Sequence, residues 1–374
     1  MLSRREVLQA GVGVAAGAAL TPLAGCSESG SPAETAQPSA PGSGTPKGGG
    51  TTTAEPLRIV QTGAEQQRSL ASVVRIDEHP TYQIDWWGSS PTVEGEGELN
   101  AAARAEWAVT ASLPPFGCTL FAALGDPDRP IVARNFDWDP HPAMVVRARP
   151  SNGFASTAVT DLAYYGFDDI RRPLDLDDAG VRESMSRAPS LAFDGVNEHG
   201  LFIGLAADEG ARAAYSDDLL AVGGVSVQRL VLDRCRTVES AKAVVAAYNL
   251  DFAGGPPLHY LIADRAGAAT IVEFVGGRLT FHDRPEQQPW LVLENFNYGA
   301  VPEPQRSAYP RWNGCTERLA DSDGRMTVGA ALETLYDVRQ DHTQWSVVYD
   351  LANGDAHLFT GQARERVHRI PLAR

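Results

Sequence analysis

Cysteine is scarce in this sequence, which has four cysteines in 374 residues. None of them forms a Cys-x-x-Cys pair, and no His-Glu-x-x-His sequence occurs, so we expect neither a metal site nor a cofactor. A Gly-x-Ser-x-Gly nucleophile elbow and a Gly-x-x-x-x-Gly-Lys phosphate loop are also absent. Their absence argues against two common classes of enzyme, the serine hydrolases with that elbow and the P-loop nucleotide-binding proteins.

Basic residues are few in comparison with acidic ones. The chain has 32 Lys and Arg against 47 Asp and Glu, which gives a formal net charge of −15. Nucleic-acid binding relies on Lys and Arg that neutralise phosphates, and no basic stripe is visible, so we expect no nucleic-acid partner. Apolar residues make up 43% of the chain and charged residues 21%, which is ordinary for a globular protein with a buried core.

Apolar runs long enough to span a bilayer are missing outside the N-terminus. The N-terminus itself has a twin arginine, Ser3-Arg4-Arg5, ahead of an apolar run, which is typical of a Tat-type export signal. The run ends in Leu23-Ala24-Gly25-Cys26, which resembles a lipobox. We therefore predict a signal over 1–26 and a protein held at the outer face of a bacterial cytoplasmic membrane only by a lipid on Cys26. The alternative is an ordinary cleaved signal, which would release a secreted protein.

The next segment, 27–56, is rich in Gly, Ser, Pro and Thr and is predicted to be a flexible tether. From Leu57 onward, strand-like and helix-like sequences alternate in blocks. Strands joined by hairpin turns, with helices in separate blocks, predict an α+β fold built of layers. The expected strands are Met144–Ala148, Ser190–Phe193, Leu201–Leu205, Leu258–Ala263, Thr270–Phe274 and Arg278–Phe281, and the expected helices are Val225–Cys235, Thr237–Tyr248 and Thr327–Val338.

Cys118 opens one short apolar run, Cys118–Leu124, and a second run, Ile131–Trp138, follows it. Two such runs joined by a turn predict an antiparallel hairpin, which brings Arg134 and Asp137 close to Cys118. A thiol beside a guanidinium and a carboxylate is typical of an activated nucleophile. Taken singly, Cys118 is better interpreted as a buried strand residue, and Arg134 with Asp137 as a structural ion pair.

The segment before Cys118 suggests how such a thiol obtains a base. A helical sequence, Glu98–Ser112, ends at Pro114-Pro-Phe-Gly117, where proline stops the helix and glycine frees the backbone. The Gly117–Cys118 bond is then placed for self-cleavage, which leaves Cys118 as a new N-terminus. Its free α-amine, with an ordinary pKa of about 7.7–8.0, lies beside a thiol of about 8.5, so no catalytic His is required.

These residues resemble the choloylglycine hydrolase, penicillin V acylase and acid ceramidase group of N-terminal nucleophile (Ntn) hydrolases, which cleave linear amides. The likeness covers Cys118 to about Thr360, and Cys118, Arg134 and Asp137 match the family in type and spacing. The other matching stretches are Asp194-Gly-Val-Asn-Glu-His-Gly-Leu201, Leu291-Val-Leu-Glu-Asn295, Ser307-Ala-Tyr-Pro-Arg311 and Gln344-Trp-Ser-Val-Val-Tyr-Asp350.

The resemblance implies an αββα sandwich of two antiparallel sheets flanked by helices. It implies that Cys118 is the nucleophile with its α-amine as base, that Asp137 holds this amine, and that Arg134 favours the thiolate. Asn295 would donate to the oxyanion, and Arg311 would stabilise charge near the nucleophile. It further implies a pro-segment or α subunit at 57–117 and a catalytic domain at 118–374.

Two departures from the family affect these expectations. Where bile-salt hydrolases have a second oxyanion Asn, this chain has Ala206, whose backbone N–H is the expected substitute. The segment before Cys118 is long, as in acid ceramidase, so Trp86, Trp87 and Trp107 are expected to pack on the core. We interpret Asp194, Asn197 and Gly200 as turn residues.

Two further sets of residues are assigned no catalytic role. We interpret His259 as a satisfied core residue in a strand. Cys235 and Cys315 can pair as a disulfide, although a role as small buried apolar residues is favoured.

The predicted function is that of an exported cysteine Ntn hydrolase of linear, non-peptide amides, with a small-molecule N-acyl amine, N-acyl amino acid, penicillin or bile salt as substrate. An acyltransferase with the same thioester chemistry and a catalytically dead substrate-binding lipoprotein remain as alternatives. A papain-like peptidase is disfavoured, because the Cys-Gly-Ser-Cys type of signature is absent. Neither the individual substrate nor the oligomeric state can be predicted from the sequence.

Overall fold

The computed structural model describes residues 60–90, 117–213, 216, 218–252 and 256–373. All of them belong to one compact unit, Thr52–Arg374. The predicted signal, the tether, the helix at Glu98–Ser112, Trp107 and the lipidation site Cys26 lie outside the described residues. Among the described helices, none is long and apolar enough to cross a membrane.

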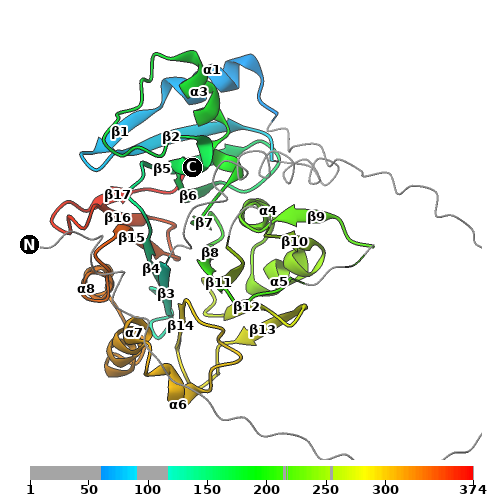
Figure 1. The fold of residues 1–374 in the computed structure, drawn as a ribbon, viewed down its shortest axis with the longest axis vertical. Coiled ribbons are helices and arrows are strands. Elements are labelled where there is room, and N and C mark those ends of the chain that lie inside the picture. Colours follow the sequence, from blue (N-terminus) through cyan, green and yellow to red (C-terminus); the bar gives the residue numbers. More distant parts are fainter. Residues whose placement is uncertain (1–59, 91–116, 214–215, 217, 253–255, 374) are drawn as a thin grey trace, which may run out of the picture. The chain divides into compact units, whose positions relative to one another are not determined.

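Two large sheets dominate the described fold (Figure 1). The nine-stranded sheet has the order β1-β2-β5-β6-β7-β8-β11-β12-β13, and the six-stranded sheet has the order β14-β3-β4-β15-β16-β17. The strands of the first are β1 (Val74–Asp77), β2 (Thr81–Gly88), β5 (Ala143–Pro150), β6 (Ser156–Asp161), β7 (Asp194–Asn197), β8 (Leu201–Ala207), β11 (Leu258–Asp264), β12 (Ala269–Val275) and β13 (Arg278–Asp283). Those of the second are β3 (Gly117–Ala123), β4 (Ile131–Asp137), β14 (Trp290–Glu294), β15 (Thr343–Asp350), β16 (Ala356–Thr360) and β17 (His368–Ile370).

Helices cover the outer face of each sheet, as Figure 1 shows. Helices α4 and α5 pack on β7, β8 and β11, and helices α7 and α8 pack on β3, β4, β14 and β15. The helices are α1 (Gly63–Ala71), α3 (Ala179–Ser186), α4 (Val227–Arg234), α5 (Val238–Ala246), α6 (Glu303–Arg306), α7 (Pro310–Asp321) and α8 (Val328–Asp337), with short 3-10 turns η3 (Leu162–Tyr165) and η4 (Ala188–Ser190). A small parallel pair, β9 (Ala221–Gly223) and β10 (Asn249–Asp251), completes the elements of the described region.

The two sheets face each other across a shared apolar core. A Cβ added to Gly204 of β8 would lie only 2.8 Å from Leu120 Cδ2 of β3, so the absence of a side chain at Gly204 lets the sheets approach closely. A second apolar cluster, which includes Phe121 and Ala133, lies between the outer face of the six-stranded sheet and Cys315 and Leu335 of α7 and α8. This helix–sheet–sheet–helix layering confirms the predicted αββα sandwich.

Most of the expected elements are present. Helix α5 begins after Thr237, whose side chain accepts from Ser240 N, and α8 begins after Thr327 in the same way. The turn after Asn197 ends in Gly200 with φ of 74°, where an added Cβ would lie 2.2 Å from the carbonyl oxygen of Leu351. Glycine is therefore required at this turn for its backbone conformation and for the close approach of a second chain segment.

One expected strand is wrong. Residues 188–190 form the 3-10 turn η4 with Pro189 near its start, and β7 begins only at Asp194. Proline favours the first turn of a helix, because its φ is fixed near the helical value and its missing N–H needs no partner there. The prediction followed the apolar character of Ser190–Phe193 and overlooked this proline.

Cys118, Cys235 and Cys315 are all buried, and each has a free thiol. Cys235 follows α4 beside the nine-stranded sheet, whereas Cys315 belongs to the cluster under α7 and α8. The two are therefore small buried residues in separate parts of the core, as the favoured interpretation expected.

The described part of the segment before Cys118 belongs to the nine-stranded sheet. Strand β2 pairs in parallel with β5 along its whole length, from Thr81 opposite Ala143 to Gly88 opposite Pro150. Trp86 is 3% exposed within the core, and the half-buried Trp87 lies under the guanidinium of Arg68 at 3.7 Å from the ring centroid. The expectation of packing on the core is confirmed for Trp86, whereas Trp87 lies outside the core cluster and contacts the guanidiniums of Arg68 and Arg149.

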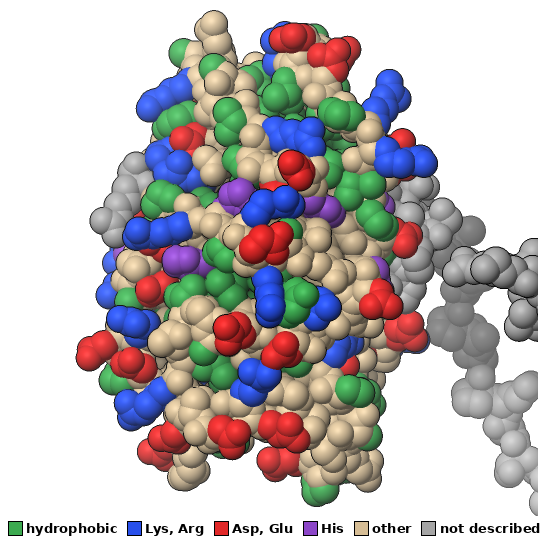
Figure 2. Space-filling view, turned by 90° about the vertical axis from the view of Figure 1, so that its left-hand side faces the viewer, with side chains coloured by type: hydrophobic (Ala, Val, Ile, Leu, Met, Phe, Trp, Pro, Cys, Tyr) green, Lys and Arg blue, Asp and Glu red, His purple; other side chains and the backbone are tan. Residues whose placement is uncertain are grey.

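On the face shown in Figure 2, Lys and Arg side chains lie among Asp and Glu side chains and form no continuous basic stripe.

Candidate active site

The β3–β4 hairpin places the thiol of Cys118 beside Arg134, as the sequence predicts. The antiparallel register puts Cys118 opposite Phe136, Leu120 opposite Arg134 and Gly117 opposite Asp137. Arg134 Nη2 donates to Cys118 Sγ at 3.1 Å, and both side chains are fully buried. A buried guanidinium in contact with a thiol is a strong local influence on that thiol's ionisation.

Arg134 is held in place by the opposite sheet. Its Nη1 donates to Asp194 Oδ2 at 2.7 Å and to the carbonyl oxygen of Phe193 at 2.7 Å. Asp194 also accepts from Trp345 Nε1 at 3.2 Å and from the hydroxyl of Tyr349. Asp194 thus joins β7 to strands β4 and β15 across the core.

The interpretation of Asp194 as a turn residue is therefore wrong. The carboxylate is fully buried, and it caps no turn but binds Arg134. Its position in the family-like Asp-Gly-x-Asn stretch was the only signal for a special role. Sequence reasoning missed this role because the partners of Asp194 lie on strands that are distant along the chain.

Burial decides the protonation of the nucleophile in this structure. Desolvation raises the pKa of Cys118 to about 11, although Arg134 acts in the opposite direction. The thiol is therefore neutral at pH 7 while the Gly117–Cys118 peptide is intact. The expectation that Arg134 favours the thiolate is correct in direction, but burial outweighs its effect here.

The backbone atoms of Cys118 also have side-chain partners. Cys118 N donates to Asn295 Oδ1 at 2.6 Å, and Arg311 Nη1 donates to the carbonyl oxygen of Cys118 at 2.8 Å. Arg311 Nη2 donates in turn to Asn295 Oδ1 at 3.1 Å. Asn295 follows β14 and Arg311 lies in the first turn of α7, so both reach Cys118 from segments far along the chain.

Asp137 lies on the other side of the Gly117–Cys118 bond. Its Oδ1 accepts from Thr343 Oγ1 at 2.5 Å, and its Oδ2 accepts from Gln340 Nε2 at 3.0 Å and from Arg311 Nη1 at 3.1 Å. A Cβ added to Gly117 would lie 3.3 Å from this Oδ2. The carboxylate is thus fixed next to Gly117, and Thr343 and Gln340 are site residues that the sequence analysis missed.

Ala206 lies in β8, directly opposite His259 of β11. The contact between β8 and the site is made by the next residue, because Asn295 Nδ2 donates to the carbonyl oxygen of Ala207 at 2.7 Å. The role of the Ala206 N–H as an oxyanion donor stays a prediction.

The five expected residues Cys118, Arg134, Asp137, Asn295 and Arg311 therefore form one connected group of side chains. A thiol, two guanidiniums, a carboxylate and a carboxamide supply a nucleophile, positive charge and hydrogen-bond donors, which are the components of acyl transfer. In the described residues, a grouping able to hold a metal ion occurs beside this site, at Asp208, His259 and Glu273.

Comparisons with known proteins agree with this chemistry. Residues 118–298 match the family model of the linear amide C-N hydrolases, choloylglycine hydrolase family. An uncharacterised protein of Paramecium bursaria Chlorella virus 1 is 30% identical over 115 residues, which are 28% of this chain. The match spans 41% of the length of that curated relative.

Two solved structures are similar at low identity. Penicillin V acylase from Agrobacterium tumefaciens has a TM-score of 0.48 and 17% identity, over 69% of this chain and 87% of that one. A mutant of the conjugated bile acid hydrolase from Clostridium perfringens has a TM-score of 0.45 and 13% identity, over 68% of this chain and 92% of that one. Residues 118–298 are thus similar to the linear amide C-N hydrolases of the choloylglycine hydrolase family, and this match supports a hydrolase that acts on carbon–nitrogen bonds in linear amides.

Proposed function

We propose that this chain is the precursor of a cysteine hydrolase that cleaves its own Gly117–Cys118 bond and then hydrolyses linear, non-peptide amides through a thioester on Cys118. One observation carries the proposal: Sγ, N and O of Cys118 each have a different side-chain partner, namely Arg134, Asn295 and Arg311. A structural cysteine needs only an apolar surrounding for its thiol. Partners for all three atoms are what a residue needs when its thiol, amine and carbonyl must be held in one geometry.

The self-cleavage step uses only atoms of Gly117 and Cys118 and one water molecule. Sγ adds to the Gly117 carbonyl carbon, the C–N bond breaks, and the thiol proton ends on the nitrogen that becomes the α-amine. Water then hydrolyses the Gly117 thioester, which frees the thiol and leaves Gly117 as a carboxylate. Asn295 and Arg311 hold the Cys118 backbone, and Asp137 lies beside Gly117 to retain the new amine.

Substrate hydrolysis also proceeds through a thioester on Cys118, but the carbonyl carbon that is attacked now belongs to the substrate. The α-amine of Cys118 takes the thiol proton, and the thiolate adds to the substrate carbonyl carbon. Asn295 Nδ2 has two N–H donors, one of which is used by Ala207, so the second is free to stabilise the oxyanion. The leaving amine takes the proton from the α-ammonium group, and water hydrolyses the resulting thioester to release the acid.

Self-cleavage also explains how the precursor stays inactive. The thiol is buried and neutral before cleavage, with a pKa of about 11. Breaking the Gly117–Cys118 bond places an amine next to Sγ, and this amine can accept the thiol proton.

We propose that the segment before Cys118 stays bound as a subunit after cleavage. Strand β2 is hydrogen-bonded to β5, and Trp86 is buried in the core, so release would expose both an unpaired strand and a large apolar side chain. Removal of this segment would leave the nine-stranded sheet without two strands, β1 and β2.

We further propose that the protein is exported by the Tat route and anchored by a lipid on Cys26, on the basis of Arg4-Arg5 and Leu23-Ala24-Gly25-Cys26. Metabolic labelling with a radioactive fatty acid tests the anchor: the wild-type chain should be labelled, and Cys26→Ser should not. Label retained in Cys26→Ser would contradict it.

The test of the enzymatic proposal is the intact mass of the signal-less protein beside its Cys118→Ala variant. We expect two fragments that meet at Gly117 and Cys118 in the wild type, which co-elute in gel filtration, and a single chain in the variant. The processed protein is then offered an N-acyl amino acid, an N-acyl homoserine lactone, penicillin V and a taurine-conjugated bile salt, with mass spectrometry for an acyl adduct on Cys118.

Each alternative gives a different result in this experiment. Transfer of the acyl group to an added primary amine without release of the free acid would identify an acyltransferase. An uncleaved wild-type chain without an acyl adduct would refute the proposal and leave a substrate-binding protein on the same fold.

A further inference from the structure

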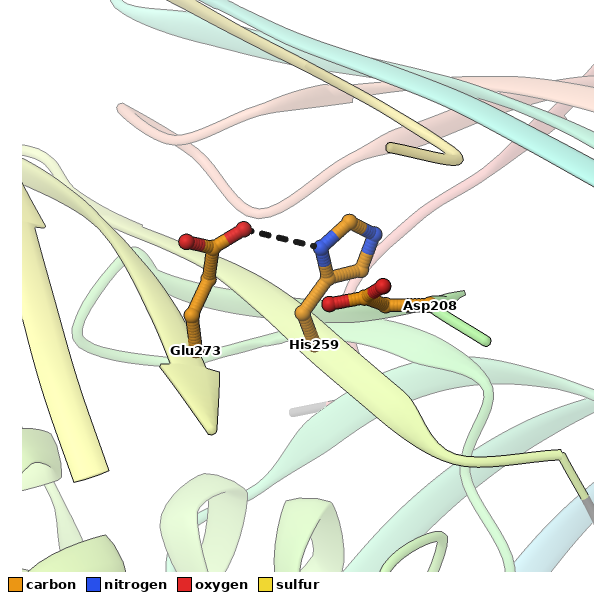
Figure 3. Close-up of side chains that lie close together, drawn as sticks. All are labelled: Asp208, His259 and Glu273. Carbon is orange, nitrogen blue, oxygen red and sulfur yellow. Dashed lines mark ion pairs between the residues drawn. The ribbon is translucent and has the colours of Figure 1, made fainter. Parts of the chain in front are cut away.

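Three potential metal ligands meet in the core at the edge of the site. Asp208 follows β8, His259 lies in β11 and Glu273 lies in β12, and their exposed fractions are 3%, 0% and 0%. Their ligand atoms all lie within 4.8 Å of one another. Figure 3 shows the imidazole of His259 between the two carboxylates, which approach it from different chain segments.

His259 is the unusual member of this group. It is fully buried, yet neither Nδ1 nor Nε2 has a hydrogen-bond partner. The nearest approach is Nδ1 to Glu273 Oε1 at 3.5 Å, which is long for a hydrogen bond. A buried polar group without a partner costs about 1–3 kcal/mol, so such a group in a native core needs an explanation. His259 is thus a core residue in a strand, as expected, with Glu273 as an ion-pair neighbour, but its ring nitrogens are not satisfied by hydrogen bonds.

The carboxylate of Glu273 is held by hydrogen bonds from neighbouring groups, as metal-binding carboxylates usually are. Gly299 N donates to its Oε2 at 2.8 Å, and Tyr298 N donates to its Oε1 at 2.5 Å. His282 Nε2 lies 3.0 Å from Oε2 on the side away from His259. The carboxylate is thus oriented by neighbouring groups other than the two further ligands.

We propose that Asp208, His259 and Glu273 together bind one divalent transition-metal ion of the zinc type. An imidazole ring with two carboxylates suits Zn²⁺, whereas Ca²⁺ and Mg²⁺ prefer sites made entirely of oxygen. A divalent cation balances the charge of two carboxylates and supplies the partner that His259 lacks. The ion would draw the three ligand atoms, now within 4.8 Å of one another, to bond lengths of about 2.0–2.2 Å and would leave a fourth position for water.

The ion would join three neighbouring segments of the nine-stranded sheet. Asp208 accepts from Asn297 Nδ2 at 3.4 Å, and its neighbour Ala207 accepts from Asn295. The ion therefore ties the end of β8 to β11 and β12 on the side of the sheet that carries the Asn295 segment. Sequence reasoning gave no sign of the site, because the three ligands come from separate segments and follow no ligand spacing.

Metal content tests the proposal without any assay of activity. The wild-type protein, purified and dialysed against metal-free buffer, is analysed by plasma mass spectrometry and titrated with Zn²⁺, Mg²⁺ and Co²⁺. We expect one tightly bound Zn²⁺ per chain, no competition from Mg²⁺, and a visible Co²⁺ absorption spectrum of a site with low coordination number. Zn²⁺ should also raise the melting temperature, because a ligand that binds only the folded state stabilises it.

Two variants locate the ion, and a third serves as a control. His259→Gln and Asp208→Asn should each weaken Zn²⁺ binding by more than about 100-fold, since loss of even an outer partner costs about 10–100-fold. His357→Gln changes a half-buried histidine on β16 in the other sheet and should bind Zn²⁺ like the wild type.

The proposal is overturned if the folded wild-type chain neither contains nor binds Zn²⁺ or Co²⁺. It is equally overturned if both His259→Gln and Asp208→Asn keep the wild-type affinity, because the ion would then bind elsewhere. If one variant fails to fold, the other and the Co²⁺ spectrum of the wild type still decide.

Discussion

The two arginines of the active site have the same chemistry but different surroundings. Arg134 is fully buried and binds the thiol of Cys118 and the carboxylate of Asp194. Arg311 keeps 16% of its side chain exposed and binds the backbone of Cys118, together with Asp137 and Glu294. One arginine therefore belongs to the core and contacts the thiol, whereas the other lies at the rim and binds the carbonyl oxygen of Cys118.

Arg134→Met should have the largest effect on stability of any single substitution in the site. It leaves Asp194 as a buried carboxylate without its cation, and breaking one partner of a buried ion pair typically costs about 3–5 kcal/mol. Urea unfolding of the unprocessed Cys118→Ala background measures this loss. The double change Arg134→Met with Asp194→Asn should recover part of it, and a double variant as unstable as the single one would contradict the ion-pair explanation.

Asn295→Ala tests the backbone side of Cys118. Removal of one oxyanion donor typically slows acyl transfer by about 10²–10³-fold, or about 2.7–4 kcal/mol. We expect kcat for amide hydrolysis by the processed enzyme to fall by that factor in Asn295→Ala, with little change in KM. The control is Asn313→Ala, which removes an exposed carboxamide of α7 that pairs only with Glu317 in the described hydrogen bonds. Equal rates in wild type and Asn295→Ala would remove Asn295 from the proposed mechanism.

The pH dependence of the free energy of unfolding tests the protonation of the Cys118 thiol. The pKa of Cys118 is about 11 in the folded precursor, against an ordinary value near 9, so the folded state holds its proton more tightly. The resulting stability is fully present below pH 9 and is lost as pH rises from about 9 to 11, by about 2–3 kcal/mol. Urea unfolding of the uncleaved precursor at several pH values under reducing conditions should show this loss, and Cys118→Ala should show a smaller one. If the free energy of unfolding fell equally with pH in both proteins, Cys118 would make no contribution to the pH dependence.

Arg311→Met should have the smallest effect on stability, about 1–2 kcal/mol, because water reaches its side chain and its carboxylate partners keep other donors. Asp137 still accepts from Thr343 and Gln340, and Glu294 still accepts from Trp312 N. Self-cleavage should nevertheless slow markedly, since Arg311 holds the Cys118 carbonyl. Thermal unfolding and a processing time course separate the two effects. A loss of stability as large as that of Arg134→Met would erase the distinction between the two arginines.

Local sequence was a good guide wherever neighbours along the chain are also neighbours in space. The β3–β4 hairpin could be predicted, and with it the contact between Cys118 and Arg134, because an antiparallel pair joined by a short turn has few possible registers. Helix starts at Thr237 and Thr327 were equally local. The strand predicted before Asp194 failed where Pro189 turned the chain.

Long-range partners were beyond such reasoning. The resemblance to a family indicated that Asn295 and Arg311 matter, but their hydrogen bonds to Cys118 depend on the packing of β14 and α7 against β3. The same holds for Gln340 and Thr343, whose roles have no sequence signature, and for Asp194, whose only signal was its place in a family-like stretch.

Local patterns and the order of the motifs were enough to predict the layered α+β class, the hairpin that presents Cys118, and the family whose model residues 118–298 match. The packed molecule was needed to reveal that the thiol is neutral, that Asp194 anchors Arg134, and that His259 lies between two carboxylates without a hydrogen bond to its ring nitrogens. Each of these depends on burial and on groups brought together from distant segments, and desolvation and charge act through space rather than along the chain.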